Sequence, residues 1–397
     1  MSSKLTADQV LTGATGSLGA HIVSLLLNQP SVSKVCCLIR GANPLLRLQK
    51  SFKEKELPLP ESSKLHILTS NLNETHLGLN DADYRALRLS ATHIIHCAWP
   101  VNFQLGLPSF IPSLQGLQKL IQLSLSTSLP TPARFIFGSS IFAALGTPAP
   151  LHIPEAPINS LEQVSYTGYG ASKLVGERIV QAAVEKYGAK ATILRIGQAV
   201  GDTKAGIWND TEAFPLIIRS AVTMGILPEI EMACKWLPVD TLAEAILEIV
   251  ELDHGRVGTM PASADIETEE QLVYNVLSPH TFSWAWDLLP ALHKMALPAF
   301  ETVPFDEWVA RLRSLSDSAG TAGKAADPNH NPAIKLINVF ASDFAGNKVH
   351  TEVVFEIEKA KQMSPALRKA PKVIESLLLE KIVEKWMKKW RKETVLE

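Results

Sequence analysis

A tyrosine and a lysine four positions apart, Tyr169 and Lys173, are the residues whose types and spacing most directly suggest chemistry. Positions i and i+4 lie on one face of a helix, one turn apart. An ammonium beside a phenol favours the phenolate and lowers a phenol pKa that is ~10 in water. We therefore expect Tyr169 to donate a proton to a developing alkoxide near neutral pH. Because this spacing also arises by chance on many helices, the pair needs support from its surroundings.

A third polar residue, Ser140, ends the predicted strand Arg134 to Ser140 and precedes Tyr169 by 29 positions. Its hydroxyl can act as a second donor to a developing oxyanion. A hydroxyl that only stabilises a turn is the ordinary role of a serine at a strand end. Tyr169 opens the next helical stretch, which favours the functional reading of Ser140.

A glycine-rich turn near the N-terminus indicates a place for a cofactor. The short strand Val10 to Thr12 leads into a Gly-xx-Gly-xx-Gly turn and then into a helical pattern, His21 to Leu27. Backbone N–H groups in such a turn can bind a pyrophosphate at the helix N-terminus. The residues expected there are Gly13, Thr15, Gly16, Ser17, Leu18 and Gly19. The spacing differs from the strict Gly-x-Gly-xx-Gly fingerprint, so a tight turn without a ligand remains the alternative.

The next predicted strand, Lys34 to Arg40, ends in a basic residue. An acid is usual about ~20 residues after the glycines when the ribose carries a free 2′-hydroxyl. This chain has Arg40 there, and a guanidinium binds a 2′-phosphate through paired hydrogen bonds. We therefore predict NADPH rather than NADH. Arg47 is a second candidate for this site, although a solvated helix face explains it as well.

Predicted strands that alternate with helical stretches indicate an α/β fold, a Rossmann-type doubly wound parallel sheet. The remaining strands are expected at 64–72, 92–98 and 191–196. Ligands gather at the carboxyl ends of such strands, where Gly13, Arg40, Ala98 and Ser140 all lie. His96 lies inside its strand and is expected to be a satisfied core histidine.

The length of 397 residues favours two lobes. We expect an NADP-binding domain over 1–202 and about 236–258, with Asp240 capping a helix over 241–250. A smaller, mostly helical substrate lobe is expected over about 203–235 and 259–397, with a small-residue loop at 314–332. In the last forty residues, Ile374, Leu377, Leu378, Ile382 and Trp386 form an apolar stripe on a basic helix. This helix either packs on its own lobe or docks an acidic partner.

Composition limits the remaining function classes. The chain is 46% hydrophobic and 20% charged with a net charge of −2, which gives no reason to expect nucleic acid. No run of ~18 apolar residues indicates a membrane span, and the first residues, Met1 to Gln9, lack the apolar core expected of a signal peptide. The four cysteines lack metal-ligand spacing, so we expect no metal and a reduced, cytoplasmic location.

Together, Ser140, Tyr169, Lys173 and the glycine turn resemble the extended short-chain dehydrogenase/reductase family. Within it, the chain is similar to terminal thioester reductase domains of carboxylic acid reductases and non-ribosomal-peptide-synthetase-like enzymes, particularly fungal ones. The supporting segments are Leu11 to His21, Cys37 to Gly41, His96 to Phe103, Arg195 to Gln198, Trp236 to Asp240 and Asn331 to Leu336. In two departures, Asn71-Leu72 replaces the usual Asp-Leu beside the adenine, and a first strand clipped at Gln9-Val10 suggests a trimmed piece of a longer chain.

The resemblance implies NADPH-dependent reductive release of an acyl thioester from a phosphopantetheine carrier domain, normally upstream in the same polypeptide. The product would be an aldehyde, or an alcohol after a second reduction. Tyr169 would donate the proton, Ser140 would be a second donor, and Lys173 would hold the nicotinamide ribose. Other expected cofactor contacts are Asn71, Leu72, Ala98, Trp99, Ile196 and Gln198. Asn102 would line the pantetheine or substrate channel.

Two other functions remain open. An extended reductase or epimerase that acts on a free ketone or sugar nucleotide uses the same three side chains. A non-catalytic dinucleotide sensor, or a relative that releases product without redox chemistry, commonly lacks the tyrosine, which this chain keeps.

Overall fold

The computed structural model describes residues 7–60, 62–146, 152–158, 160, 164, 167–250, 272–317, 333–334 and 353–395. The chain divides into two compact units. The first comprises Met1–Ala199, Val239–Pro279 and Val353–Ala370, and the second comprises Val200–Pro238, His280–Glu352 and Pro371–Glu397.

The first unit is built on a seven-stranded sheet in the order β12-β7-β5-β4-β1-β2-β3, in which all neighbours are parallel. The strands are β1 (Ala7–Thr12), β2 (Val32–Ile39), β3 (Leu65–Thr69), β4 (Ala91–His96), β5 (Arg134–Ser140), β7 (Ala191–Ile196) and β12 (Val273–Val276). This arrangement confirms the predicted Rossmann-type sheet. β1 has six residues, so the expectation that the first strand is clipped is wrong.

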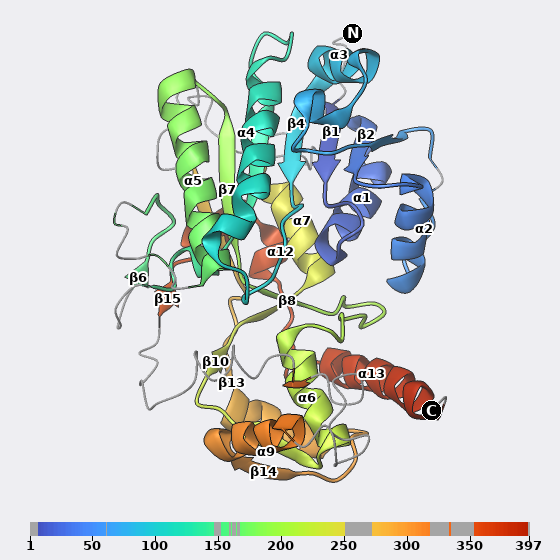
Figure 1. Cartoon of the computed structure of the whole chain (residues 1–397), viewed down its shortest axis with the longest axis vertical. Coiled ribbons are helices and arrows are strands. Elements are labelled where there is room, and N and C mark those ends of the chain that lie inside the picture. Colours follow the sequence, from blue (N-terminus) through green and yellow to red (C-terminus); the bar gives the residue numbers. More distant parts are fainter. Residues whose placement is uncertain are drawn as a thin grey trace. The chain divides into compact units, whose positions relative to one another are not determined.

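Successive strand residues point to opposite faces of the sheet, so apolar residues on a strand can pack against helices. Val10 and Phe135 share one buried cluster with Leu117 of α4 and Val180 of α5. Figure 1 shows α4 beside α5. The helices of this unit are α1 (Ser17–Asn28), α2 (Pro44–Glu54), α3 (Asp81–Ser90), α4 (Ile111–Leu125), α5 (Gly168–Tyr187), α7 (Val239–Ile249), α11 (Glu358–Met363) and α12 (Pro365–Arg368).

Short elements complete this unit. They are the 3-10 turns η1 (Thr75–Gly78), η2 (Leu107–Phe110) and η3 (Ile141–Ala143), and the parallel strand pair β6 (His152–Ile153) and β15 (Val354–Phe355). β8 (Gln198–Val200) follows β7. α7 begins at Val239, so Asp240 lies in its first turn rather than at the predicted cap position before it.

The predicted boundary between the lobes differs from the observed units. β12 pairs with β7, and residues 353–370 also belong to the first unit. The assignment of everything from 259 onward to the second lobe was therefore too broad. Residues 251–271 lie outside the described part of the chain, as does the predicted loop beyond Asp317, which ends α9.

The second unit has its own core, which includes Trp208, Trp236, Trp284, Trp308 and Trp390. Its helical elements are α6 (Ala213–Thr223), η6 (Trp284–Leu288), α8 (Leu289–His293), α9 (Phe305–Asp317) and α13 (Leu377–Val395). Its strands are β9 (Ile226–Glu229), β10 (Ala233–Cys234), β11 (Trp236–Pro238), β13 (Phe282–Ser283) and β14 (Glu301–Pro304). β9 pairs with β14, and β10 with β13.

The basic C-terminal helix α13 packs on its own unit, as one of the two predictions had it. Leu378, Ile382 and Trp386 of the apolar stripe are buried, whereas Leu377 is 77% exposed. Trp386 Nε1 donates to the carbonyl of Trp208 at 3.0 Å. Among the described residues, no helix is long and apolar enough to cross a membrane.

Candidate active site

Ser140 and Tyr169 meet at the carboxyl end of β5. Ser140 is the last residue of β5, Tyr169 is the second residue of α5, and their side chains form a hydrogen bond. The Ser140 hydroxyl also accepts a 3.3 Å hydrogen bond from the N–H of Phe142. Two hydroxyls predicted to serve one oxyanion are therefore adjacent in the structure.

The start of α5 is held firmly, which positions Tyr169. Thr167 caps the helix by accepting a hydrogen bond from the N–H of Gly170 at 3.1 Å. A Cβ at Gly168 would lie 2.2 Å from the carbonyl oxygen of Leu105. Only glycine at this position allows the 105–107 loop to approach the helix so closely.

Aromatic rings surround Tyr169, which is 7% exposed. The centroids of Phe103, Phe142 and Phe110 lie 5.2, 6.0 and 6.3 Å from the centroid of its ring. Burial raises the pKa of Tyr169, and the hydrogen bond with Ser140 offsets part of this effect. The sequence-based expectation of a lowered pKa is therefore wrong for this environment, because loss of water dominates.

Lys173 lies one turn further along α5 and is buried among aromatic rings. Its ammonium donates to the Gly138 carbonyl at 2.6 Å and lies 4.5 Å from the Trp99 ring centroid and 5.0 Å from that of Phe137. It also lies over the ring of Tyr169, 5.8 Å from the centroid. Burial lowers the pKa of Lys173 to about 7. Contacts with the ring faces favour the charged form, but they do not restore the lost hydration.

His96 stands beside this group inside β4, as predicted for a core residue. Its Nδ1 shares a 2.7 Å hydrogen bond with the Thr12 hydroxyl, while Nε2 has no partner among the described residues. Burial, with a smaller effect of nearby Lys173, lowers the pKa of His96 to about 3. His96 is therefore neutral near pH 7, and within the described part of the chain only one of its two nitrogens is hydrogen-bonded, so the expected core histidine is only half satisfied.

The glycine turn fits the pyrophosphate of a dinucleotide. Gly13 has φ +81, and a Cβ there would lie 2.8 Å from the Cys97 carbonyl carbon; a Cβ at Gly19 would lie 2.1 Å from the Gly13 oxygen. The turn is closed by a 2.9 Å hydrogen bond from the N–H of Gly16 to Gly13. α1 then begins at Ser17 without an acidic residue in its first turn or a described side-chain cap. Its first N–H groups and positive dipole end are suited to an anion.

The two predicted phosphate-binding arginines are exposed and adjacent. Arg40 directly follows β2, and Arg47 of α2 donates to the carbonyl of Arg40. The Arg47 guanidinium therefore lies against the backbone of Arg40, just after β2. Asn71, after β3, is also exposed, and its amide donates to Glu74 at 2.6 Å. Leu72 is half-buried.

The other predicted contacts lie on several loops of the first unit. The N–H of Ala98 donates to the Thr12 hydroxyl at 3.3 Å, and Trp99 Nε1 donates to Ser172 at 3.1 Å. Thr15 and Leu18 are half-buried at the glycine turn and the start of α1. Ile196 ends β7 and Gln198 begins β8, and both are half-buried, whereas Asn102 is exposed. The structure thus brings Trp99 to Lys173, whereas Asn102 bonds the N–H of nearby Gln104.

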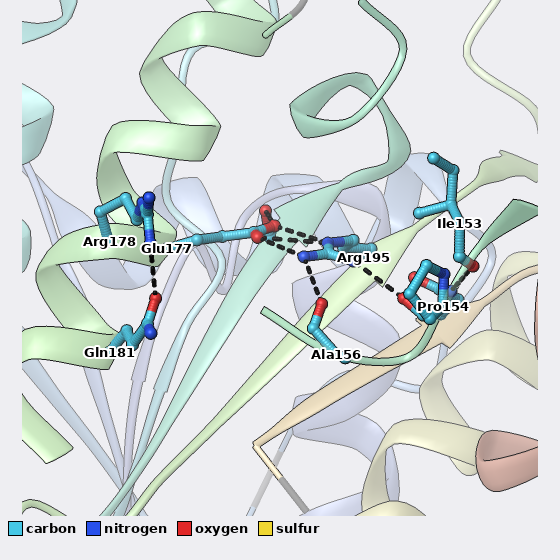
Figure 2. Close-up of polar contacts among 9 residues, drawn as sticks. Ile153, Pro154, Ala156, Glu177, Arg178, Gln181 and Arg195 are labelled. Carbon is cyan, nitrogen blue, oxygen red and sulfur yellow. Dashed lines mark hydrogen bonds and ion pairs between the residues drawn. The ribbon is translucent and has the colours of Figure 1, made fainter. Parts of the chain in front are cut away.

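A buried ion pair beside this group was missed by sequence reasoning. Glu177 Oε2 and Arg195 Nη2 are 2.8 Å apart, with 4% and 0% of their side chains exposed (Figure 2). The available signal was a charged residue, Arg195, within an otherwise apolar strand. Its partner could not be identified, because nothing local in the sequence pairs β7 with that face of α5.

Comparisons with known proteins cover most of the chain. The family model described as "Male sterility protein" matches residues 11–246. The "Adenylate-forming reductase Nps10" of Heterobasidion annosum is 34% identical over 341 residues, 84% of this chain and 29% of that protein. The "Non-reducing polyketide synthase dbaI" of Emericella nidulans is 30% identical over 347 residues, 84% of this chain and 13% of that protein. The chain therefore spans less than a third of either relative.

A solved structure agrees in fold. The "terminal R domain from the myxalamid PKS-NRPS biosynthetic pathway" superimposes with a TM-score of 0.80, at 20% identity, over 98% of this chain and 92% of that one. The relatives and this neighbour confirm the resemblance that the sequence motifs indicate.

Proposed function

Because the chain belongs to the family described as "Male sterility protein", whose model is that of an NAD-binding domain, we propose that it reduces a carrier-bound acyl thioester with NADPH and releases an aldehyde. The observation that carries this proposal is the meeting of Ser140, Tyr169 and Lys173 at the carboxyl end of β5. The name of the relative from Heterobasidion annosum, an adenylate-forming reductase, supports the reaction class.

The residues that would hold the cofactor follow from the fold. The turn from Gly13 to Gly19 and the N-terminus of α1 would bind the pyrophosphate. Arg40, with Arg47 beside it, would bind the 2′-phosphate, which favours NADPH over NADH. Lys173 would hold the nicotinamide ribose. Asn71, Leu72, Ala98, Trp99, Ile196 and Gln198 are the further proposed contacts.

Bound NADPH supplies a hydride to the thioester carbonyl carbon. The carbonyl oxygen then gains negative charge, and Tyr169 donates a proton to it while Ser140 donates a hydrogen bond. Burial raises the pKa of Tyr169, so its phenol keeps its proton near pH 7 until negative charge develops on the carbonyl oxygen. The resulting hemithioacetal breaks its C–S bond and releases the pantetheine thiol and an aldehyde. One NADPH and one proton are consumed for each thiol.

The proposed partner is an acyl group on the phosphopantetheine arm of a carrier domain. The two relatives are three or more times longer than their matched portions, and we place the carrier upstream in the same polypeptide. Asn102, on the exposed loop before η2, is the proposed contact for the arm or the acyl group. We propose a cytoplasmic location.

A comparison of substrates tests this proposal against a reductase of free ketones or sugar nucleotides. The purified chain would receive NADPH with an acyl-pantetheine thioester, a simple ketone or a sugar nucleotide. We expect thiol release and NADPH oxidation with the thioester, at a kcat/KM at least about tenfold above that for the ketone. Turnover of only the free substrates would end the thioester proposal.

A further inference from the structure

The buried carboxylate of Glu177 connects the strands and the helix that carry the proposed site. Glu177 belongs to α5, one turn after Lys173 and two turns after Tyr169. Its Oε1 accepts from the Ser139 hydroxyl at 2.6 Å and from Arg195 Nε at 3.1 Å. β5, α5 and β7 therefore meet at one carboxylate.

The contact with Ser139 acts next to the reacting group. Ser139 directly precedes Ser140 on β5, and the residue is buried, with 3% of its surface exposed. Because Ser139 and Ser140 are consecutive residues of β5, a hydrogen bond on the Ser139 side chain restrains the backbone that carries Ser140. Glu177 thereby influences where the Ser140 hydroxyl meets Tyr169.

Arg195 donates its hydrogen bonds to other parts of the protein, namely Glu177 and two backbone carbonyls. Its Nη1 donates to the Pro154 carbonyl at 3.2 Å and its Nη2 donates to the Ala156 carbonyl at 3.0 Å (Figure 2). Glu155, between these two residues, accepts from the N–H of Asn275 on β12 at 3.1 Å. Burying such an ion pair removes both charges from water, and their mutual attraction must offset that cost. Apolar residues of similar volume would often stabilise the fold as well.

Glu177 also lies one helical turn from Lys173 on α5, so it carries a carboxylate near the buried ammonium. The titratable groups around Lys173 are His96 at the end of β4, Cys97 directly after it, Tyr169 and Glu177 from α5, and Arg195 from β7 behind Glu177. Burial raises the pKa of Cys97 to about 11, so its thiol is neutral near pH 7. Among the described groups, this leaves the Glu177 carboxylate to favour the protonated form of Lys173.

We propose that Glu177 is a positioning residue, which fixes the end of β5 that presents Ser140 and places a negative charge one helical turn from Lys173. This inference rests on the proposed function of Ser140, Tyr169 and Lys173. Glu177 acts through these residues and does not touch the substrate.

The substitution Glu177→Gln tests the charge, because an amide has nearly the shape of the carboxylate. In the wild type, turnover should fall as the pH rises through the pKa of Lys173, about 7, since deprotonation removes the charge that holds the ribose. In Glu177→Gln this fall should begin about one pH unit lower. We also expect kcat to drop at least about tenfold, while the KM for the thioester changes less than about threefold. A structural defect alone would lower activity equally at every pH.

Three variants control for folding and position. Glu185→Gln makes the same change at an exposed site on α5, where Glu185 accepts from Gln181 at 2.7 Å, and should match the wild type. Ser139→Ala removes only the contact with β5 and should lower kcat without moving the pH dependence. Glu177→Asp keeps the charge and should retain the wild-type pH dependence.

NADPH affinity, measured by fluorescence titration between pH 6 and pH 9, gives a second readout without turnover. We expect its weakening with rising pH to begin about one unit lower in Glu177→Gln. A folded Glu177→Gln variant with wild-type kcat and wild-type pH dependence would overturn the inference. If Glu177→Gln does not fold, an unchanged kcat in Ser139→Ala overturns it instead. Failure of the wild type to reduce any thioester would refute the proposed function, while the titration would still test Glu177.

Discussion

Tyr169 is surrounded by aromatic rings, and this environment determines its protonation state. Phe103 and Phe142 contact its ring, water is largely excluded, and the pKa is raised. The sequence predicted the pairing with Lys173 from i, i+4 spacing, because helix geometry is local. It did not predict the direction of the pKa shift, because burial depends on Phe103, which lies 66 positions earlier in the chain.

The substitution Tyr169→Phe should remove the proposed proton donor while keeping the packing of the ring. We expect turnover to fall about 10²- to 10⁴-fold, because the oxyanion loses its donor. NADPH affinity, followed by fluorescence titration, should stay within about threefold of the wild type. Tyr187→Phe is the matched control, since Tyr187 ends the same helix and is 71% exposed. Wild-type turnover in Tyr169→Phe would refute the assigned role.

The substitution Arg40→Ala tests the choice of cofactor. An exposed guanidinium at the end of β2 should bind the 2′-phosphate, so its loss should weaken NADPH binding by about tenfold or more. NADH binding should change little, because NADH lacks this phosphate. Equilibrium titrations with both cofactors measure the difference. Equal affinity of the wild type for NADH and NADPH would show that Arg40 does not select the cofactor.

At the scale of elements, the sequence predicted the glycine turn and the strands around it, but it did not predict β12. The alternation of strand-like and helical stretches predicted β2, β4 and β7. β12 has only four residues and a buried polar one, Asn275, whose amide donates to the carbonyls of Ile153 and Glu356 at 3.1 and 2.8 Å. These partners lie 122 and 81 positions away, so no local pattern identifies them.

The close packing within the glycine turn makes Gly19 intolerant of a side chain. A Cβ at Gly19 would lie 2.1 Å from the carbonyl oxygen of Gly13, so Gly19→Ala must displace backbone. We expect it to lower the free energy of unfolding by more than about 3 kcal/mol and to abolish NADPH binding. Gly188→Ala is the control, because nothing lies within 4 Å of its Cβ; with φ +65 it should cost only about 1 kcal/mol. Urea unfolding compares the two, and equal costs would contradict this account of the turn.

At the scale of the whole molecule, the chain contains two units with separate cores. The sequence indicated two lobes from length and from the break in strand–helix alternation. The predicted boundary was wrong, because β12 and residues 353–370 belong to the first unit although segments of the second unit precede them in the chain. Burial of the apolar stripe of α13 in the second unit leaves its charged face, rather than its apolar one, towards solvent.

Packing of α13 predicts how the second unit responds to mutation. Trp386 is 2% exposed and bonds the carbonyl of Trp208, so Trp386→Ala should cost about 3–5 kcal/mol of stability. Leu377→Ala, at an exposed position on the same helix, should change stability by less than about 0.5 kcal/mol. Thermal unfolding followed by calorimetry would compare both variants with the wild type. A similar, small effect of both would show that the helix is not part of this core.

The central claim is hydride transfer to a thioester at the Ser140–Tyr169–Lys173 site, and an isotope experiment tests it most directly. The chain would be mixed with an acyl-pantetheine thioester and NADPH deuterated at its hydride-donating carbon, and the products identified by mass. We predict one NADPH oxidised for each thiol released and an aldehyde with one deuterium on the former carbonyl carbon. An alcohol with two deuterium atoms on that carbon would mean that the same site reduces twice. Thiol release with a free acid and no oxidised NADPH would contradict the account.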